Sequence, residues 1–162
     1  MKELKDVFSY NPLTGYLTRL ISAGGVYVGD VVGCKRPNGY LMVSINGKQR
    51  RAHRVAWELY YGKEPDGDID HINHIRDDNR IINLRVVTKA ENNKNMRMHS
   101  KNKTGISGVS WESDRGKWLS YIGANKKRHV KLGRFDSFLD ACCSRKSAEI
   151  DYGYHANHGA SL

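Results

Sequence analysis

The segment from residue 68 to residue 98 constrains the fold more than any other part of this sequence. Two brief apolar-rich runs, DIDHI and LRVV, flank the polar loop NHIRDDNRIIN, and the sequence Thr88-Lys-Ala-Glu91 follows. A Thr followed three residues later by Glu is the capping-box signature of a helix start. The segment therefore predicts strand, loop, strand and helix in that order, with the helix over about Lys89 to Met98.

The residues before this segment predict short strands and one helix. The run GYLMVSINGKQRRAH places Asn46-Gly47 between two extended runs, which is a strong signal for a β-hairpin. After His53, the run RVAWELYYG has apolar residues at helical spacing and ends on Gly62, a typical C-cap. We expect this short amphipathic helix to pack on the hairpin.

From Ile106 the sequence predicts a second unit. Three extended runs, ISGVSW, KWLSYIGA and HVKLGRF, precede Ser137, an expected N-cap for a helix that closes at Gly153. The polar run HSKNKTG before them is typical of a linker. In a chain of 162 residues, each module has to be small. We therefore expect an N-terminal β region and core over residues 1–98 (the core from about 50), a linker over 99–105, and a small three-stranded antiparallel sheet packed on one helix over 106–162.

The charge is strongly positive and unevenly distributed. The formal net charge is +10, and a cationic surplus of this size in a globular protein favours a polyanionic partner, nucleic acid above all. Residues 85–131 hold 12 Lys and Arg against three acids, whereas residues 63–80 hold six acids against three bases. An acidic stretch within a basic protein indicates a cation site.

The three cysteines show no C-x-x-C pair, which gives no support to a zinc ribbon or a disulfide framework and favours a reducing, cytoplasmic compartment. No apolar run approaches 18 residues, and the charged start MKELKD lacks the core of a signal peptide. We expect no membrane association.

The predicted strand and helix carry groups suited to phosphodiester hydrolysis, which needs an activated water and a positive centre near the scissile phosphate. Asp70 offers a carboxylate and Asn92 an amide oxygen, both hard ligands that Mg²⁺ accepts. His71 can act as the base. Asp70 and His71 are neighbours on a strand and should point to opposite sides of its pleat, while Asn92 lies on the first turn of the predicted helix.

The run DHINHIRDDNRIINLRVVTKAENNKN resembles the core of the HNH endonucleases, in particular the homing-endonuclease branch common in bacteriophages. The resemblance implies a ββα-metal fold and Mg²⁺ as cofactor, with Mn²⁺ as a substitute. It implies that Asp70 and Asn92 bind the ion and that His71 is the general base. It also implies that Asn83 braces the loop so that the imidazole is oriented.

Two features of this region have other interpretations. His74 stands where many relatives have Gly and forms H-x-x-H with His71, but a zinc site would need further ligands, and no cysteine lies nearby. We expect His74 to be exposed to solvent or near a phosphate. His53 and Arg54 precede a helix, where packing and a phosphate contact are equally plausible roles, and they stay outside the predicted catalytic set.

The C-terminal run from Gly105 to Gly153 resembles the apetala/ethylene-response-factor DNA-binding domain, with its GV-x-W, KW-x-x-x-I and LG-x-F motifs. The plant factors carry Arg where this chain has Ser110 and Gly123, so base-specific contacts cannot be transferred. Trp111, Trp118 and Phe135 are expected in the core. We expect the following residues to bind DNA, mostly through phosphates: Arg85, Lys94, Arg97, Arg115, Lys117, Lys126, Lys127, Arg128, Lys131 and Arg134.

Together these observations predict an α+β, homing-type DNA endonuclease that acts on double-stranded DNA in the host cytoplasm. With one core it should nick one strand as a monomer, without a protein partner. The main alternative is a non-catalytic, sequence-specific DNA-binding or regulatory protein that keeps the HNH core as a scaffold. An RNA-binding protein would also suit the charge, but leaves the spacing of Asp70, His71 and Asn92 unexplained.

Overall fold

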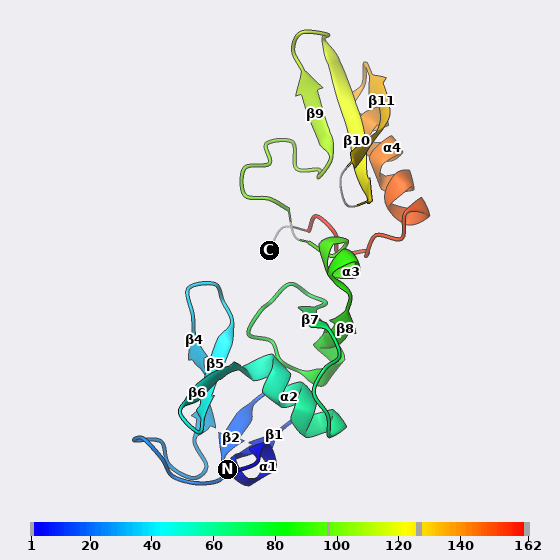
Figure 1. Ribbon diagram of the computed structural model, residues 1–162. Helices are drawn as coiled ribbons and strands as arrows, with labels where there is room; N and C mark the ends of the chain where they lie inside the picture. Colours follow the sequence, from blue (N-terminus) through cyan, green and yellow to red (C-terminus); the bar gives the residue numbers. More distant parts are fainter. Residues whose placement is uncertain (1, 97, 126–127, 161–162) are drawn as a thin grey trace. The chain divides into compact units, whose positions relative to one another are not determined.

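The computed structural model describes residues 2–96, 98–125 and 128–160. It divides into two compact units, Met1–Asn92 and Asn93–Leu162 (Figure 1). Mixed α and β elements make up both units, as the sequence predicts. No helix in the described part of the chain has the length and apolar character to cross a membrane.

The first unit opens with two small antiparallel sheets. The first sheet has the order β1-β2-β3 and the second the order β4-β5-β6. The hairpin between β5 and β6 turns at Asn46 and Gly47, both with positive φ, which confirms the predicted turn. The elements up to this point are α1 (Leu4–Val7), β1 (Phe8–Tyr10), β2 (Leu17–Arg19), β3 (Val31–Val32), β4 (Cys34–Lys35), β5 (Leu41–Ile45) and β6 (Lys48–Arg51).

Helix α2 (Ala52–Tyr61) follows β6 directly and buries one face against these sheets. Val55 and Ala56 are fully buried, and the helix ends at Gly62 in the left-handed conformation (φ 73°), as expected for a C-cap. Val55 joins the apolar cluster around Phe8 and Leu17. Ala56 packs instead with Ile69 and Leu84 of the next hairpin. The helix therefore links the N-terminal sheets to the segment that carries Asp70 and His71.

That segment forms the predicted strand, loop, strand and helix. Strand β7 (Asp68–His71) pairs antiparallel with β8 (Leu84–Val87), and the short 3-10 helix η1 (Ile81–Asn83) closes the intervening loop. Helix α3 (Lys89–Asn93) begins with the predicted capping box: the backbone N–H of Thr88 donates to Glu91 Oε2, and that of Glu91 donates to Thr88 Oγ1.

The prediction that this helix extends to Met98 is wrong, because α3 ends at Asn93. The carbonyl oxygens of Lys94 and Met96 accept hydrogen bonds from the backbone N–H groups of His155 and Gly159. Pairing with a segment distant in sequence thus replaces the local helical bonds, which no pattern within residues 89–98 indicates.

The second unit is a three-stranded antiparallel sheet with one helix, as expected. Strands β9 (Val109–Glu112), β10 (Lys117–Asn125) and β11 (Arg128–Phe135) have the order β11-β10-β9, and α4 (Phe138–Asp151) packs on this sheet (Figure 1). Ser137 Oγ accepts from the N–H of Asp140 at the start of α4, and Gly153 has positive φ just after its end. Both predicted ends of this helix are confirmed.

The core of the second unit differs from the predicted one. Val109, Ile122 and Ala141 are buried, but Trp111 is 49% exposed and packs against Trp118 at the margin of the sheet. The expectation that Trp111 is a core residue is therefore wrong. It lies on β9, an edge strand, opposite Trp118, where one side of the indole stays in solvent.

The segment 99–105 forms a hydrogen-bonded loop. Asn102 Oδ1 accepts from the backbone N–H groups of Thr104 and Gly105, and Thr104 Oγ1 donates to the carbonyl oxygen of Val109. The linker over 99–105 stays a prediction, and these local Asn and Thr bonds give the segment a defined shape.

Candidate functional site

Asp70 lies in the β7–β8 hairpin with its carboxylate in an ion pair. It is buried (8% exposed), and Arg85 stands directly opposite on β8. The guanidinium of Arg85 donates from Nε (3.0 Å) and Nη2 (2.7 Å) to Asp70 Oδ2. Residues directly opposite on antiparallel strands are close enough for such contacts. A buried carboxylate is thus present at this site with a cation beside it.

His71 follows Asp70 at the end of β7 and is 4% exposed. Its Nε2 lies 3.0 Å from Oδ1 of Asn79, which is also buried. An amide oxygen accepts hydrogen bonds, so this contact favours the tautomer with the proton on Nε2. Sequence reasoning did not single out Asn79, although it belongs to the DNR part of the motif.

Asn83 makes its contacts with the loop backbone. Its Oδ1 accepts from the N–H of Asn73 (3.0 Å), and its Nδ2 donates to the carbonyl oxygen of Asp78 (2.8 Å). Asn73 also donates from its side chain to the Asp78 carboxylate. These bonds tie both ends of the loop 73–78 together.

The N-terminal turn supports the same loop at Asn79. The hydroxyl of Tyr10 donates to the carbonyl oxygen of Asn79 at 2.7 Å, and the N–H of Ile81 donates to the carbonyl oxygen of Pro12. Gly15 has φ +78°, and a Cβ there would lie 2.5 Å from the Arg80 nitrogen. Only glycine allows this close approach of two backbones.

Two further rings surround His71. The ring centre of His53, on α2, lies 5.1 Å from that of His71, and Tyr40, just before β5, lies 5.3 Å from His53 and 5.8 Å from His71. We call Tyr40, His53 and His71 the three-ring cluster. His53 is 2% exposed, so it packs in the interior beside the predicted base. The AHR sequence could have indicated His53, but nothing local indicates Tyr40.

Burial determines the charge state of both histidines. It lowers the pKa of His71 below its usual 6.5, and nearby Arg76 acts in the same direction, while Asn79 and Asp70 oppose it. Burial, with the charges of His71, Arg51 and Arg54, lowers the pKa of His53 to about 3. Both imidazoles are therefore neutral near pH 7, the form in which an imidazole accepts a proton.

Asn92 is half-buried on α3, and its backbone N–H donates to the carbonyl oxygen of Thr88, the capping residue. Mg²⁺ typically takes one or two protein oxygens and retains several waters. The Asp70 carboxylate and Asn92 amide are donors of this kind, and Asp70 Oδ2 is paired with the Arg85 guanidinium. Among the described residues, no group of three or more His, Cys, Asp or Glu is placed to hold a metal. A zinc site on His71 and His74 would therefore find no third His, Cys, Asp or Glu ligand among the described residues.

Comparison with known proteins places this site in a family. Residues 50–94 match a family model described as HNH endonuclease. Protein 3.8 of Escherichia phage T7 is 35% identical over 83 residues, which are 51% of this chain and 69% of that protein. This chain belongs to the HNH endonuclease family. A solved structure described as DNA binding and cleavage by the HNH homing endonuclease I-HmuI is similar with a TM-score of 0.41 and 24% identity. The similarity covers 56% of this chain and 53% of that chain, so it spans about half of each.

The HNH segment 50–94 contains Asp70, His71, Asn83 and Asn92. His74, within it, has positive φ (64°), a backbone conformation that glycine adopts most easily.

The cations predicted to contact DNA have varied surroundings. Arg85 pairs with Asp70, Lys117 with Asp136, and Arg134 with Glu112. Lys94 donates to the carbonyl oxygen of Tyr152 at 2.6 Å. Arg115 lies 3.6 Å from Asp114, and Lys131 is exposed on β11. Arg97, Lys126 and Lys127 fall outside the described residues, as does the side chain of Arg128.

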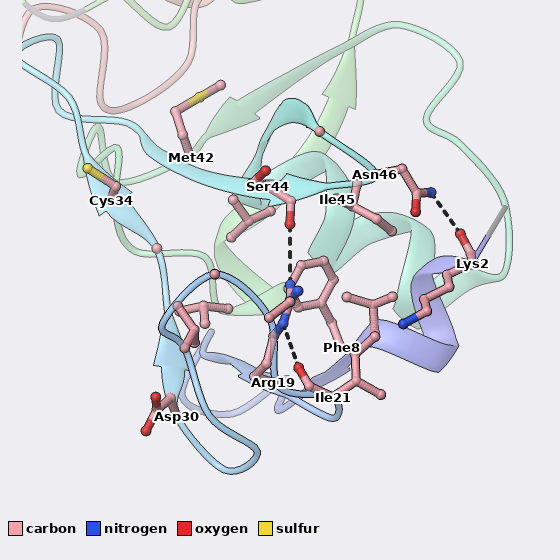
Figure 2. Close-up of a pocket in the computed structure, with 18 of the residues that line it drawn as sticks. Lys2, Phe8, Arg19, Ile21, Asp30, Cys34, Met42, Ser44, Ile45 and Asn46 are labelled. Carbon is pink, nitrogen blue, oxygen red and sulfur yellow. Dashed lines mark hydrogen bonds between the residues drawn. The ribbon is translucent and has the colours of Figure 1, made fainter.

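A cavity of about 1290 Å³ between the two N-terminal sheets lies apart from this site (Figure 2). Arg19 spans it, donating from Nε to the carbonyl oxygen of Ile21 and from Nη1 to that of Ser44. The bond to Ser44, on β5, joins the two sheets, whereas Ile21 lies just after β2 in the segment of Arg19 itself. None of Asp70, His71 and Asn92 lines it.

Proposed function

We propose that this HNH protein is a divalent-metal-dependent DNA endonuclease with His71 as its general base. The observation that carries the proposal is the contact between His71 and Asn79, which holds a neutral imidazole by Nε2 beside the buried carboxylate of Asp70. In this proposal the contact with Asn79 orients the imidazole. A neutral imidazole in a fixed orientation is what general-base catalysis requires.

Asp70 and Asn92 would hold the metal ion, preferably Mg²⁺ with Mn²⁺ as a substitute. When bound, the ion supplies a positive centre for the scissile phosphate and the leaving 3′ oxygen. In this proposal His71 removes a proton from the attacking water, and Asn83 keeps the loop 73–78 in shape. The products carry 5′-phosphate and 3′-hydroxyl ends.

Targeting is proposed to rest largely on the second unit, which we interpret as apetala-like. The exposed Lys131 on β11 supports phosphate contacts there, and Arg115 and Arg128 are proposed to add to them. One HNH core gives one active site, so we propose a homing-type, phage-encoded enzyme that nicks one strand of DNA as a monomer in the host cytoplasm. The proposed enzyme has two modules, a nuclease module over residues 1–98 and a DNA-binding module over residues 106–162.

Incubation of supercoiled plasmid with the protein and Mg²⁺ tests the proposal. Open circles should accumulate before linear DNA, and EDTA should stop the reaction. His71→Ala should lower the rate by about 10²–10⁴-fold, the usual contribution of a general base, with DNA binding retained. His74→Gly is the matched control in the same loop and should keep its activity, because glycine suits the positive φ there.

If the wild type leaves plasmid and several linear DNAs intact with either metal, the nuclease proposal fails. DNA binding without cleavage would favour the alternative of a regulatory protein built on an HNH scaffold.

A further inference from the structure

Two arginines from different parts of the first unit contact the same aromatic ring. The guanidinium carbons of Arg51, at the end of β6, and Arg76, in the loop between β7 and η1, each lie 5.1 Å from the ring centre of Tyr40. Tyr40 belongs to the three-ring cluster and lies 5.8 Å from His71. One DNA strand rises about 3.4 Å per nucleotide. Both cations therefore lie within a few nucleotide steps of the proposed base.

The neighbouring acids pair with other cations. Asp77 pairs with Lys35 and Asp78 with Arg80, and Arg50, adjacent to Arg51 in β6, pairs with Glu58 and Glu64. Across the described part of the chain, Arg51 and Arg76 make no ion pair with a carboxylate. Their charge is thus uncompensated beside a site proposed to cut a polyanion.

The contacts of both guanidinium groups with Tyr40 are compatible with further hydrogen bonds from their N–H groups. A guanidinium that packs its face on an aromatic ring keeps its N–H groups at the edge, where they can bind phosphate oxygens. Arg76 uses Nη1 to donate to the carbonyl oxygen of Asn38 at 2.8 Å, which fixes this side chain. Arg51 is exposed to solvent. Tyr40 therefore brings two cations together beside His71.

We propose that Arg51 and Arg76, which both contact the ring of Tyr40, form a binding site for backbone phosphates of DNA next to the scissile bond. The inference rests on the proposed nuclease function and adds a phosphate-binding site in the first unit, separate from the apetala-like sheet. Such contacts fix the register of the duplex and carry no sequence information. The site therefore positions any DNA sequence against His71.

Fluorescence anisotropy with a short mixed-sequence DNA duplex in EDTA tests this site, because binding is then measured without cleavage. The measurement is the slope of log affinity against log KCl concentration over about 50–200 mM. Arg51→Gln and Arg76→Gln should each reduce the slope by about 0.9, the value for one phosphate contact, and the double variant by about twice that.

Three further variants complete the design. Arg51→Lys and Arg76→Lys keep the charge and should keep the slope, which separates lost phosphate contacts from lost folding. Arg50→Gln, whose cation already pairs with two acids, should leave the slope unchanged.

Unchanged slopes in Arg51→Gln and Arg76→Gln, or an equal loss in Arg50→Gln, would overturn the phosphate site even if the wild type cuts plasmid. A wild type that fails to cut while the two variants lose slope would instead contradict the nuclease proposal and leave the phosphate site standing.

Discussion

The imidazole of His71 lies 3.0 Å from the amide oxygen of Asn79 across the loop that joins β7 to η1. Both side chains are buried, so water competes little for this bond. The contact favours the neutral tautomer that carries its proton on Nε2. It also makes the proposed activity depend on a residue outside the D, H and N positions that the sequence motif emphasises.

Replacing Asn79 should alter the pH dependence of cleavage. Asn79→Asp places a carboxylate beside the imidazole and should raise the pKa of His71. The base is active when neutral, so the acidic limb of the pH–rate profile should move to higher pH, with activity falling more at pH 6 than at pH 8. Asn79→Ala should lose about 10- to 100-fold, as is usual for groups that orient a functional histidine. Asn93→Ala, on exposed α3, is the control, and an unmoved profile in Asn79→Asp would refute the assignment.

His53 should make the fold less stable in acid. Its pKa of about 3 lies below the ordinary 6.5, so between these values the unfolded state binds a proton that the folded state does not. As the pH is lowered from 6.5 toward 3, His53 alone should decrease the free energy of unfolding by about 1.4 kcal/mol for each pH unit. Urea denaturation from pH 7 to pH 4 measures the effect. His53→Phe, which cannot titrate, should lose less stability than the wild type, and parallel curves would show that His53 is not held neutral.

Arg85 should stabilise the hairpin through Asp70. Arg85→Gln removes the guanidinium from a buried carboxylate and should cost about 1.5–3 kcal/mol, the range for hydrogen bonds to charged groups. If Asp70 is a metal ligand, Mg²⁺ should raise the Tm of Arg85→Gln more than that of the wild type. In Asp70→Asn the response to Mg²⁺ should be weak. Equal Mg²⁺ responses in all three proteins would argue against Asp70 as a ligand.

Glu112 should limit phosphate binding by the C-terminal sheet, because its carboxylate pairs with Arg134. This pair lowers the pKa of Glu112, so the acid is ionised at neutral pH. Glu112→Gln removes the competing anion and should tighten DNA binding, with a salt dependence steeper by about 0.9 if Arg134 then contacts one phosphate. Anisotropy titrations of the wild type, Glu112→Gln and Glu112→Gln with Arg134→Gln measure this. A steeper slope that persists in the double variant would exclude Arg134 as the new contact.

Local signals predicted the elements of this protein well. The Asn46-Gly47 turn, the Gly62 C-cap, the Thr88–Glu91 capping box and the Ser137 N-cap all stand where the sequence places them. Each depends on contacts within a few residues, so each is visible in a short window of sequence. The end of α3 at Asn93 is not visible in such a window. The carbonyl oxygens of Lys94 and Met96, just after the helix, accept hydrogen bonds from His155 and Gly159, which are distant in sequence.

In the candidate site, too, the sequence predicts the local features and not the contacts between distant segments. The motif names Asp70, His71, Asn83 and Asn92 by spacing, but the two rings that pack beside His71 come from other elements of the first unit. His53 reaches it from α2, Tyr40 from the segment before β5, and Arg76 from its own loop. Packing between segments decides these neighbours, and a single sequence carries no periodic or capping signal for it.

The close approach of the N-terminal turn to Asn79 and Arg80 means that the HNH segment is not a self-sufficient part. Tyr10, Pro12 and Gly15 lie well before the matched residues 50–94, yet they contact the backbone that presents Asn79 to His71. Grafting residues 50–94 into another scaffold would transfer the reactive side chains without the N-terminal turn that supports their loop. A bulkier residue at Gly15 would therefore displace the backbone of the loop even though it lies outside the matched segment.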